Sequence, residues 1–228
     1  MKKPVIAVAG VATALFLASG AAVAADLVCT SFSTGGTWHN VVVPAGAFCT
    51  LNNSRVTGNV TVKEGGSLQV TAISGDTTIA GDIKGDGCDS INLDGTGPSG
   101  RIVIGGNLTI QNVTFTGFSG ATGNPSCPPS PPQNVLIGGN VKCDNVAGGC
   151  SFSYVIISGN LECSGNANGC GLASAAVGQN ASINNNGSTT IVDNSEIGGD
   201  LKCSGNFGGV GGATNTIAGT KSGQCSGL

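Results

Sequence analysis

Hydrophobic and polar positions in the second half of the chain follow a short phrase that recurs every twenty residues. The run IGGNVKC at 137–143 returns as ISGNLEC at 157–163 and as IGGDLKC at 197–203. Within each run, Val141 and Cys143 or their equivalents alternate with a polar residue such as Lys142, and this period of two indicates a half-buried strand. Self-similarity at a fixed period is typical of solenoids. The pattern therefore predicts a stack of equivalent coils.

The same phrase, an aliphatic residue followed by Gly-[Asn/Asp] and a second aliphatic residue, extends upstream and defines eight units. Their leading aliphatic residues are Val56, Ile79, Ile104, Ile137, Ile157, Val177, Ile197 and Ile217. A second column, Phe152, Leu172 and Val192, follows fifteen residues after a leading aliphatic and predicts another strand on a different side of the coil. Neither column has the 3.6-residue period of a helix.

We therefore predict an all-β fold, a right-handed single-stranded parallel β-helix of about eight coils stapled by disulfides. Successive units are 23, 25, 33 and then four times 20 residues apart. Such variable coils suit the right-handed form better than the strict period of about eighteen residues expected of stacked hexapeptides.

A column of amide and carboxylate side chains predicts a structural corner. Its members are Asn59, Asp82, Asn107, Asn140, Asn160, Asn180 and Asp200. A glycine precedes most of them, and glycine and asparagine tolerate left-handed backbone angles. We expect the Gly-[Asn/Asp] pair to turn the chain with such angles.

The start of the chain predicts export. Lys2 and Lys3 precede an apolar run from Val5 to Leu17 and small residues up to Ala24, which is typical of a secretory signal peptide over residues 1–25. We expect an N-terminal cap at 26–55, β-helix repeats at 56–228, a proline-rich loop at 120–133 and a C-terminal cap at 217–228. After signal removal no segment is expected to insert into a membrane, and the protein is expected to be secreted or periplasmic.

The charge balance argues against nucleic acid as a partner. Removal of Lys2 and Lys3 leaves seven of the nine basic residues against twelve acidic ones, so the mature chain has no cationic surface for phosphates. Glycans or cell-envelope components are the expected partners. No cofactor is expected.

Ten cysteines in an exported chain predict disulfides. Two pairings are open for the central four, because stacked strands allow bonds between coils and short turns allow bonds within one coil. The alternatives are Cys143 with Cys163 and Cys150 with Cys170, or Cys143 with Cys150 and Cys163 with Cys170. By elimination we pair Cys203 with Cys225, Cys29 with Cys49, and Cys88 with Cys127.

Candidate chemistry is sparse. The single histidine, His39, would have to serve any Ser-His-Asp or Cys-His arrangement, and it precedes the repeats. Asp86, Asp89 and Asp94, which follow Asp82 in a glycine-rich stretch, are calcium candidates, with Arg101 close behind. Solvated turn aspartates are the favoured interpretation. Asn184, Asn185 and Asn186 would give one face polar amide groups that could contact glycans. A face that contacts only solvent is again the favoured interpretation.

A resemblance adds to this interpretation. The stretch VVVPAGAFCTL at 41–51, followed by VTGNVTV at 56–62, resembles the opening of a group of exported bacterial repeat proteins, and GDLKCSGN at 199–206 with KSGQC at 221–225 resembles their close. The resemblance implies export and a β-helix and carries no activity. The coil alone is also similar to pectate-lyase-like β-helices and polymer-forming bactofilins, in architecture only.

We expect a non-enzymatic protein with a structural, adhesive or cell-envelope-associated role. The alternative is a polysaccharide-binding protein or polysaccharide lyase that uses Asp86, Arg101 and the proline-rich loop. A monomer is expected, because Lys221 enters the core column of the last unit and Cys225 ties down that end.

Overall fold

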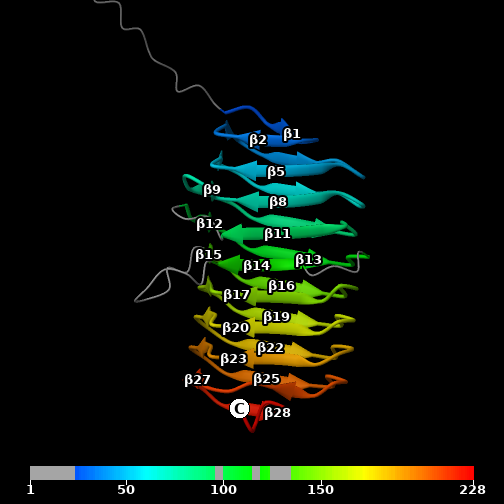
Figure 1. The fold of residues 1–228 in the computed structure, drawn as a ribbon, viewed down its shortest axis with the longest axis vertical. Coiled ribbons are helices and arrows are strands. Elements are labelled where there is room, and N and C mark those ends of the chain that lie inside the picture. Colours follow the sequence, from blue (N-terminus) through cyan, green and yellow to red (C-terminus); the bar gives the residue numbers. More distant parts are fainter. Residues whose placement is uncertain (1–23, 96–99, 115–118, 124–134) are drawn as a thin grey trace, which may run out of the picture.

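The chain forms a parallel β-solenoid of about eight turns (Figure 1). The computed structural model describes residues 24–95, 100–114, 119–123 and 135–228, and within them every regular element is a β-strand. The prediction of an all-β, disulfide-stapled parallel solenoid is therefore confirmed. Most of the predicted signal peptide and residues 124–133 of the predicted proline-rich loop lie outside the described residues.

Three parallel sheets, here called A, B and C, run along the solenoid, and each coil contributes one strand to each in turn. Sheet A contains β1 (Leu27–Val28), β4 (Val41–Val43), β7 (Val60–Val62), β10 (Ile83–Asp86), β13 (Leu108–Gln111), β16 (Val141–Asp144), β19 (Leu161–Ser164), β22 (Ala181–Asn184), β25 (Leu201–Ser204) and β28 (Lys221–Gly223). Sheet B contains β2 (Phe32–Thr34), β5 (Phe48–Asn52), β8 (Ser67–Thr71), β11 (Ser90–Gly95), β14 (Ser119–Gly123), β17 (Cys150–Ser153), β20 (Cys170–Ala173), β23 (Thr190–Asp193) and β26 (Val210–Gly211). Sheet C contains β3 (Thr37–Trp38), β6 (Arg55–Val56), β9 (Thr77–Ile79), β12 (Ile102–Ile104), β15 (Val135–Ile137), β18 (Val155–Ile157), β21 (Ala176–Val177), β24 (Glu196–Ile197) and β27 (Thr216–Ile217).

Residues that are equivalent in the predicted repeat pair with one another in neighbouring strands of each sheet. All eight leading aliphatic residues, from Val56 to Ile217, stack directly on one another in sheet C, and Trp38 precedes them in the same column. The second predicted column, Phe152, Leu172 and Val192, stacks in sheet B. Inward and outward side chains alternate along each strand, and equivalent residues stack from one coil to the next. Both aliphatic columns of the repeat therefore face the interior of the solenoid.

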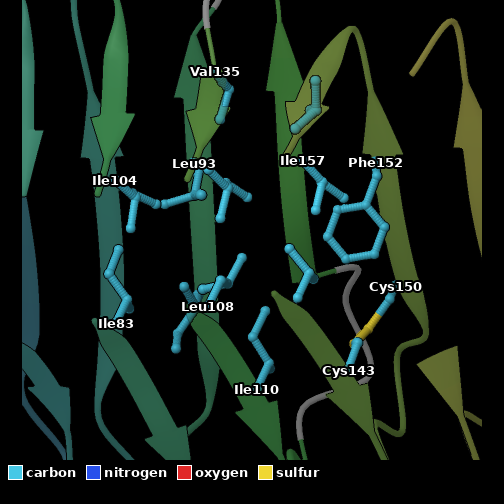
Figure 2. Close-up of a cluster of buried hydrophobic side chains, with 14 of the residues drawn as sticks. Ile83, Leu93, Ile104, Leu108, Ile110, Val135, Cys143, Cys150, Phe152 and Ile157 are labelled. Carbon is cyan, nitrogen blue, oxygen red and sulfur yellow. A yellow bond between two sulfur atoms is a disulfide. The ribbon is translucent and has the colours of Figure 1, made fainter. Parts of the chain in front are cut away.

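The core is a narrow column of aliphatic side chains with few aromatic ones (Figure 2). Phe152 is fully buried and packs in layers among residues such as Leu93, Ile104, Leu108 and Ile157. Because the three sheets approach one another closely, an inner position accepts mostly Val, Ile or Leu, which accounts for the low aromatic content of the chain.

The segments predicted as caps and loop also contribute strands. Residues 26–55 supply β1 to β5 and the first residue of β6, and residues 120–123 of the predicted loop belong to β14. At the C-terminal end the tail after β28 folds back, because the Gln224 N–H donates to the carbonyl of Cys203 and Lys221 Nζ donates to the carbonyl of Leu228. Cys225 is buried there, and Leu228 packs against the core.

Candidate functional site

The predicted amide column is a continuous hydrogen-bonded ladder at the corner between sheets C and A. In each step the backbone N–H of one member donates to the side-chain oxygen of the member one coil earlier, with N···O distances of 2.7 to 3.1 Å. Asp26 and Asn40 extend the ladder at one end and Thr220 at the other. The ladder is exposed, but its oxygens are acceptors for the next coil, so it is a structural corner as predicted.

The glycines of this corner do not have the left-handed backbone angles that we expected. Among the described residues, the positive-φ set contains neither the ladder residues nor Gly81, Gly139 or Gly159. They are required instead by close approach: a Cβ at Gly139 would lie 2.6 Å from Oδ1 of Asn107 and 2.7 Å from the carbonyl oxygen of Gly106. Glycine at these positions avoids the clash, although the ladder bond also forms at Asn180, where Gln179 replaces the glycine and the N···O distance is 3.1 Å.

Left-handed angles occur at the other two corners. Between sheets A and B they include Gly87, Asn112, Asn145, Gly165, Asn185 and Gly205. Between sheets B and C they include Asn53, Tyr154, Ser174 and Asn194. The physical reasoning about asparagine and glycine was sound, but it applied to a different turn of the coil.

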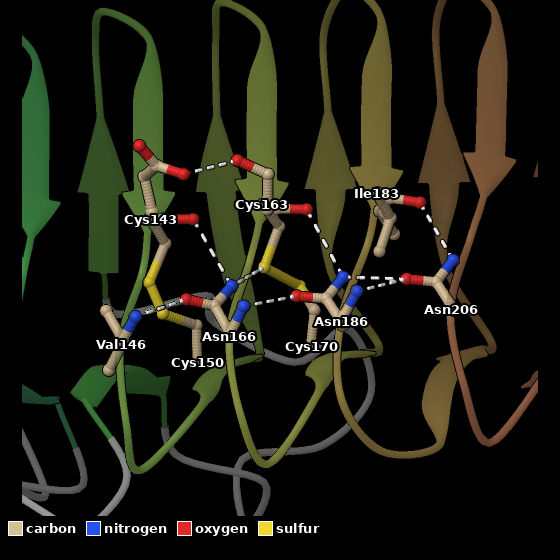
Figure 3. The surroundings of a disulfide bond; sticks show 11 residues. Cys143, Val146, Cys150, Cys163, Asn166, Cys170, Ile183, Asn186 and Asn206 are labelled. Atoms are coloured by element: carbon tan, nitrogen blue, oxygen red, sulfur yellow. Dashed lines mark hydrogen bonds between the residues drawn. A yellow bond between two sulfur atoms is a disulfide. The ribbon is translucent and has the colours of Figure 1, made fainter.

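A second ladder, which the sequence interpretation missed, is buried at the corner between sheets A and B (Figure 3). Asn166, Asn186 and Asn206 stack there, each at most 3% exposed. The Asn166 N–H donates to Oδ1 of Asn186, and the Asn186 N–H donates to Oδ1 of Asn206. Their Nδ2 groups donate to the backbone carbonyls of Cys143, Cys163 and Ile183. Their twenty-residue spacing was the available signal.

The three consecutive asparagines at 184–186 therefore have three different roles. Asn184 points outward and accepts a hydrogen bond from the Ser204 hydroxyl at 2.7 Å. Asn185 is exposed and holds the left-handed angle of the corner, with φ of 55°. Asn186 belongs to the buried ladder. The polar face predicted from these three asparagines is thus formed by only two of them.

Among the described cysteines, four disulfides staple the solenoid, all near the corner between sheets A and B. The two pairs that were predicted by elimination, Cys29–Cys49 and Cys203–Cys225, are confirmed, with Cα–Cα distances of 5.5 and 5.3 Å. For the central four the structure selects bonds within one coil, Cys143–Cys150 and Cys163–Cys170. These bonds bridge the corner from the last inward position of a sheet A strand to the first inward position of a sheet B strand.

Cys88 is fully buried and bonds to no other described cysteine, while its predicted partner, Cys127, lies outside the described residues. Burial raises the pKa of the Cys88 thiol to about 11, and the charges of Asp89 and Asp86 act in the same direction. Because the thiolate is the reactive form, this thiol is poorly suited to nucleophilic chemistry.

The four aspartates from Asp82 to Asp94 do not form one cluster. Asp82 belongs to the exposed ladder, where its Oδ1 accepts the Asn107 N–H at 2.7 Å, and Asp86 accepts a hydrogen bond from Nδ2 of Asn112 at 2.8 Å. Asp86 ends β10 and Asp94 lies in β11, with Asp89 between the two strands. No group of three or more His, Cys, Asp or Glu residues within the described ranges could hold a metal ion.

Arg101 lies on a different corner from Asp86. Its Nη2 is 3.0 Å from Oδ2 of Asp76, and its backbone N–H donates to Oδ1 of the same residue. The Arg101 contacts lower the pKa of the Asp76 carboxyl below its usual value, with the side-chain hydrogen bond as the largest cause. This pair joins the starts of β9 and β12, so the arginine acts between coils.

His39 lies at the N-terminal end of the solenoid. Its Nδ1 is 3.3 Å from Oδ1 of Asp26, and its ring also contacts the Asn40 amide, with the His39 side chain 52% exposed. The pKa of Asp26 is lowered mainly by the backbone N–H of Asn40. Within the described residues the ring thus contacts the end of the exposed ladder.

Shallow hollows occur on the described surface of the solenoid. One, of about 530 Å³, follows sheet C from Ile156 to Thr216 and is lined mainly by apolar atoms. Another, of about 340 Å³, lies over the A–B corner near Asn112, Asn145 and Ala167. Neither is enclosed.

Comparison with protein-family models, with curated proteins and with solved structures finds no match to this chain. The resemblance to exported bacterial repeat proteins therefore stays a prediction. In the described part of the chain, no helix has the length and apolar character needed to cross a membrane.

Proposed function

We propose that this protein is an exported, non-enzymatic rod with a structural, adhesive or cell-envelope-associated role outside the cytoplasm. The observation that carries the proposal is the use of its polar side chains. Asp26, Asp82 and Asp200 are ladder acceptors, and Arg101 joins two coils through Asp76. Groups that would form a catalytic cluster on another β-helix stabilise the stack here.

Four disulfides support the export part of the proposal. Disulfides persist in oxidising compartments such as the periplasm or the cell exterior. The folded-back tail, with Cys225 buried and Leu228 against the core, supports a rod whose C-terminal end does not add further copies.

The export proposal is tested by expressing the full chain in a bacterium with a periplasm and fractionating the cells. We expect a product in the periplasm or medium that lacks residues 1–25 and has its cysteines oxidised. A cytoplasmic product with an intact N-terminus and reduced cysteines would contradict the proposal. The matched control is Leu15→Arg in the apolar run, since it should block export without touching the solenoid.

The non-enzymatic part is tested with a panel of neutral and acidic polysaccharides. We expect no release of reducing ends or unsaturated uronates, with or without calcium. Release that is abolished by Asp86→Ala or Arg101→Ala would establish the lyase alternative.

The second candidate is glycan binding without cleavage, because amide and hydroxyl groups line the outside of the A–B corner. Ser164 Oγ donates to Asp144 at 2.6 Å, and Ser204 Oγ donates to Asn184 at 2.7 Å, so this row is ordered before any ligand binds. Co-sedimentation with insoluble envelope polysaccharide, compared between the wild type and Asn184→Leu, tests it. Equal recovery of both proteins would remove this face from consideration.

A further inference from the structure

The outward column of sheet C has an apolar centre flanked by two opposite charges. Between Thr37 and Thr216 its members are, from the N-terminal side, Arg55, Thr78, Val103, Leu136, Ile156, Ala176 and Glu196, which the register stacks one coil apart. The four central residues are half-buried although they point away from the core, because neighbouring coils cover their sides. Outward positions on the other two sheets carry residues such as Lys142, Glu162 and Gln69 instead.

The column is symmetric about Leu136. Val103 and Ile156 lie one coil on either side of it, Thr78 and Ala176 two coils away, and Arg55 and Glu196 three coils away. A second copy turned by 180° about an axis that lies in the interface, passes over Leu136 and runs parallel to β15 would meet the first copy face to face, with Leu136 on Leu136 and Val103 on Ile156. The same antiparallel placement would set Arg55 of each copy opposite Glu196 of the other.

We propose that this face binds a second copy of the chain, as a two-fold dimer with the two solenoids side by side and antiparallel. Such an isologous contact is self-complementary and closed, so it stops at two copies. Within the described residues neither Arg55 nor Glu196 forms an ion pair, and both are exposed. Their charges are therefore available to the partner.

The hollow along sheet C fits the same arrangement. It lies over Ala176 and Glu196, where the small alanine lowers the surface beside Ile156. The two-fold places Thr78 and Arg55 of the second copy over this lower part, so the larger side chains of one copy meet the smaller ones of the other. Shape and charge thus favour one register.

The size of the face sets the expected affinity. Seven coils at about 4.8 Å and strands of about three residues give a flat area of roughly 340 Å², below the roughly 800 Å² per partner of a standard interface. We therefore expect a dissociation constant of about ten to a few hundred micromolar, with monomer at low concentration. The monomer predicted from the sequence concerned the ends of the rod, whereas this contact uses its flank.

The test is sedimentation velocity of the mature, disulfide-intact protein from about 5 µM to about 500 µM, a range that brackets the expected constant. We expect a monomer–dimer equilibrium. Leu136→Asp places two like charges on the two-fold axis and should weaken the dimer by about a hundredfold. The control, Ser182→Asp on the outer face of sheet A, should leave the equilibrium unchanged.

The register is tested by charge exchange. Arg55→Glu or Glu196→Arg alone should weaken the dimer by about tenfold, because each change puts like charges together at both ends of the contact. The double variant should recover wild-type affinity to within about threefold. Circular dichroism and melting temperature establish that each variant is folded.

Four results would overturn the proposal. A monomer throughout the concentration range would remove it, as would a dimer that Leu136→Asp leaves intact. A double variant no tighter than the single ones would exclude the antiparallel register. Species that grow beyond two copies with concentration would indicate stacking at the ends instead.

Discussion

The two halves of the solenoid fill the same inner corner in different ways. In the column between sheets A and B the N-terminal half has Cys88, Val113 and Val146, whereas the C-terminal half has Asn166, Asn186 and Asn206. All six side chains are buried. The first three contribute contact area only. The side chains of the last three hydrogen-bond backbone groups of the coil before them, and their own backbone N–H groups donate to the coil after them.

At the corner between sheets B and C the contrast is between the middle and the two ends, because the N-terminal coils carry buried Ser54 and Thr77, and the Ser54 N–H donates to the Thr77 hydroxyl. Val135 and Val155 fill it in the middle of the chain, and Ser195 and Asn215 follow near the C-terminus. The Ala175 N–H donates to the Ser195 hydroxyl, and the Ser195 N–H donates to Oδ1 of Asn215. The C-terminal coils therefore carry polar ladders at all three corners.

The amide ladder accompanies a constant coil length in the C-terminal half of the solenoid. From the last inward position of sheet A to the first inward position of sheet B, the chain advances by seven positions wherever the amide ladder runs, at 163–170, 183–190 and 203–210. The apolar part of the column varies, with an advance of six at 85–91, nine at 110–119 and seven at 143–150. An amide must reach two specific backbone groups of a neighbouring coil, so an inserted residue breaks it. Apolar contact has no such directional requirement, and corners of different length remain compatible with it.

The largest expected effect comes from removing the central amide. Asn186→Ala removes the side-chain acceptor of the buried Asn166 N–H and the side-chain donors to the Cys163 carbonyl and to Oδ1 of Asn206, which should cost about 4 kcal/mol of unfolding free energy. Val146→Ala, the control in the apolar half of the same column, should cost about 2 kcal/mol from lost methyl groups and the cavity. Guanidinium unfolding of both variants measures the difference. Equal losses would mean that the ladder adds nothing beyond packing.

The next effect comes from untying the C-terminal end. The Asn206 N–H donates to Oε1 of Gln224, so the buried ladder ends on the residue beside the Cys203–Cys225 bond. Replacing both cysteines by alanine should cost about 3 kcal/mol. It should also expose the tail to proteases. Limited proteolysis followed by mass spectrometry detects this, and a tail as resistant as in the wild type would contradict it.

A smaller effect is expected from extending the ladder into the apolar half. The Val146 N–H already donates to Oδ1 of Asn166 at 2.9 Å, so an amide at 146 would find one polar neighbour in place and the Ile110 carbonyl one coil earlier. Val146→Asn should change the unfolding free energy by no more than about 1 kcal/mol. The control Val141→Asn, on an inward strand position, should cost about 3 kcal/mol. Equal losses would show that the column cannot be extended.

The smallest effect concerns the exposed ladder and pH. The backbone N–H and hydroxyl of Thr220 lower the pKa of Asp200 below its usual value in the folded state. A lowered folded pKa stabilises the protein above the ordinary carboxyl pKa, and this contribution disappears as the pH falls through the folded pKa. The melting temperature should therefore drop slightly in acid, and by less in Asp200→Asn. An identical acid profile for the two proteins would contradict this role of Asp200.

Particular residues show how far the sequence could be interpreted. The columns led by Val56 and Phe152 stack as their spacing predicted, because inward and outward positions alternate with a strict period of two. The ladder from Asn59 to Asp200 was also identified as a corner. Asn166, Asn186 and Asn206 have the same spacing but were missed, because a buried and an exposed asparagine look alike along the chain.

The sequence by itself determined the repeat, the parallel β-solenoid and the cysteine pairs at its two ends, since each depends on periodicity or on elimination. Only the tertiary structure decided the pairing of Cys143 with Cys150, the steric role of Gly139, and the separation of Arg101 from Asp86. These depend on which side of a corner a side chain occupies and on how closely two coils approach. Spacing along the chain shows which residues occupy equivalent positions in successive coils. Three-dimensional packing sets the direction in which each group points and its distance from its neighbours.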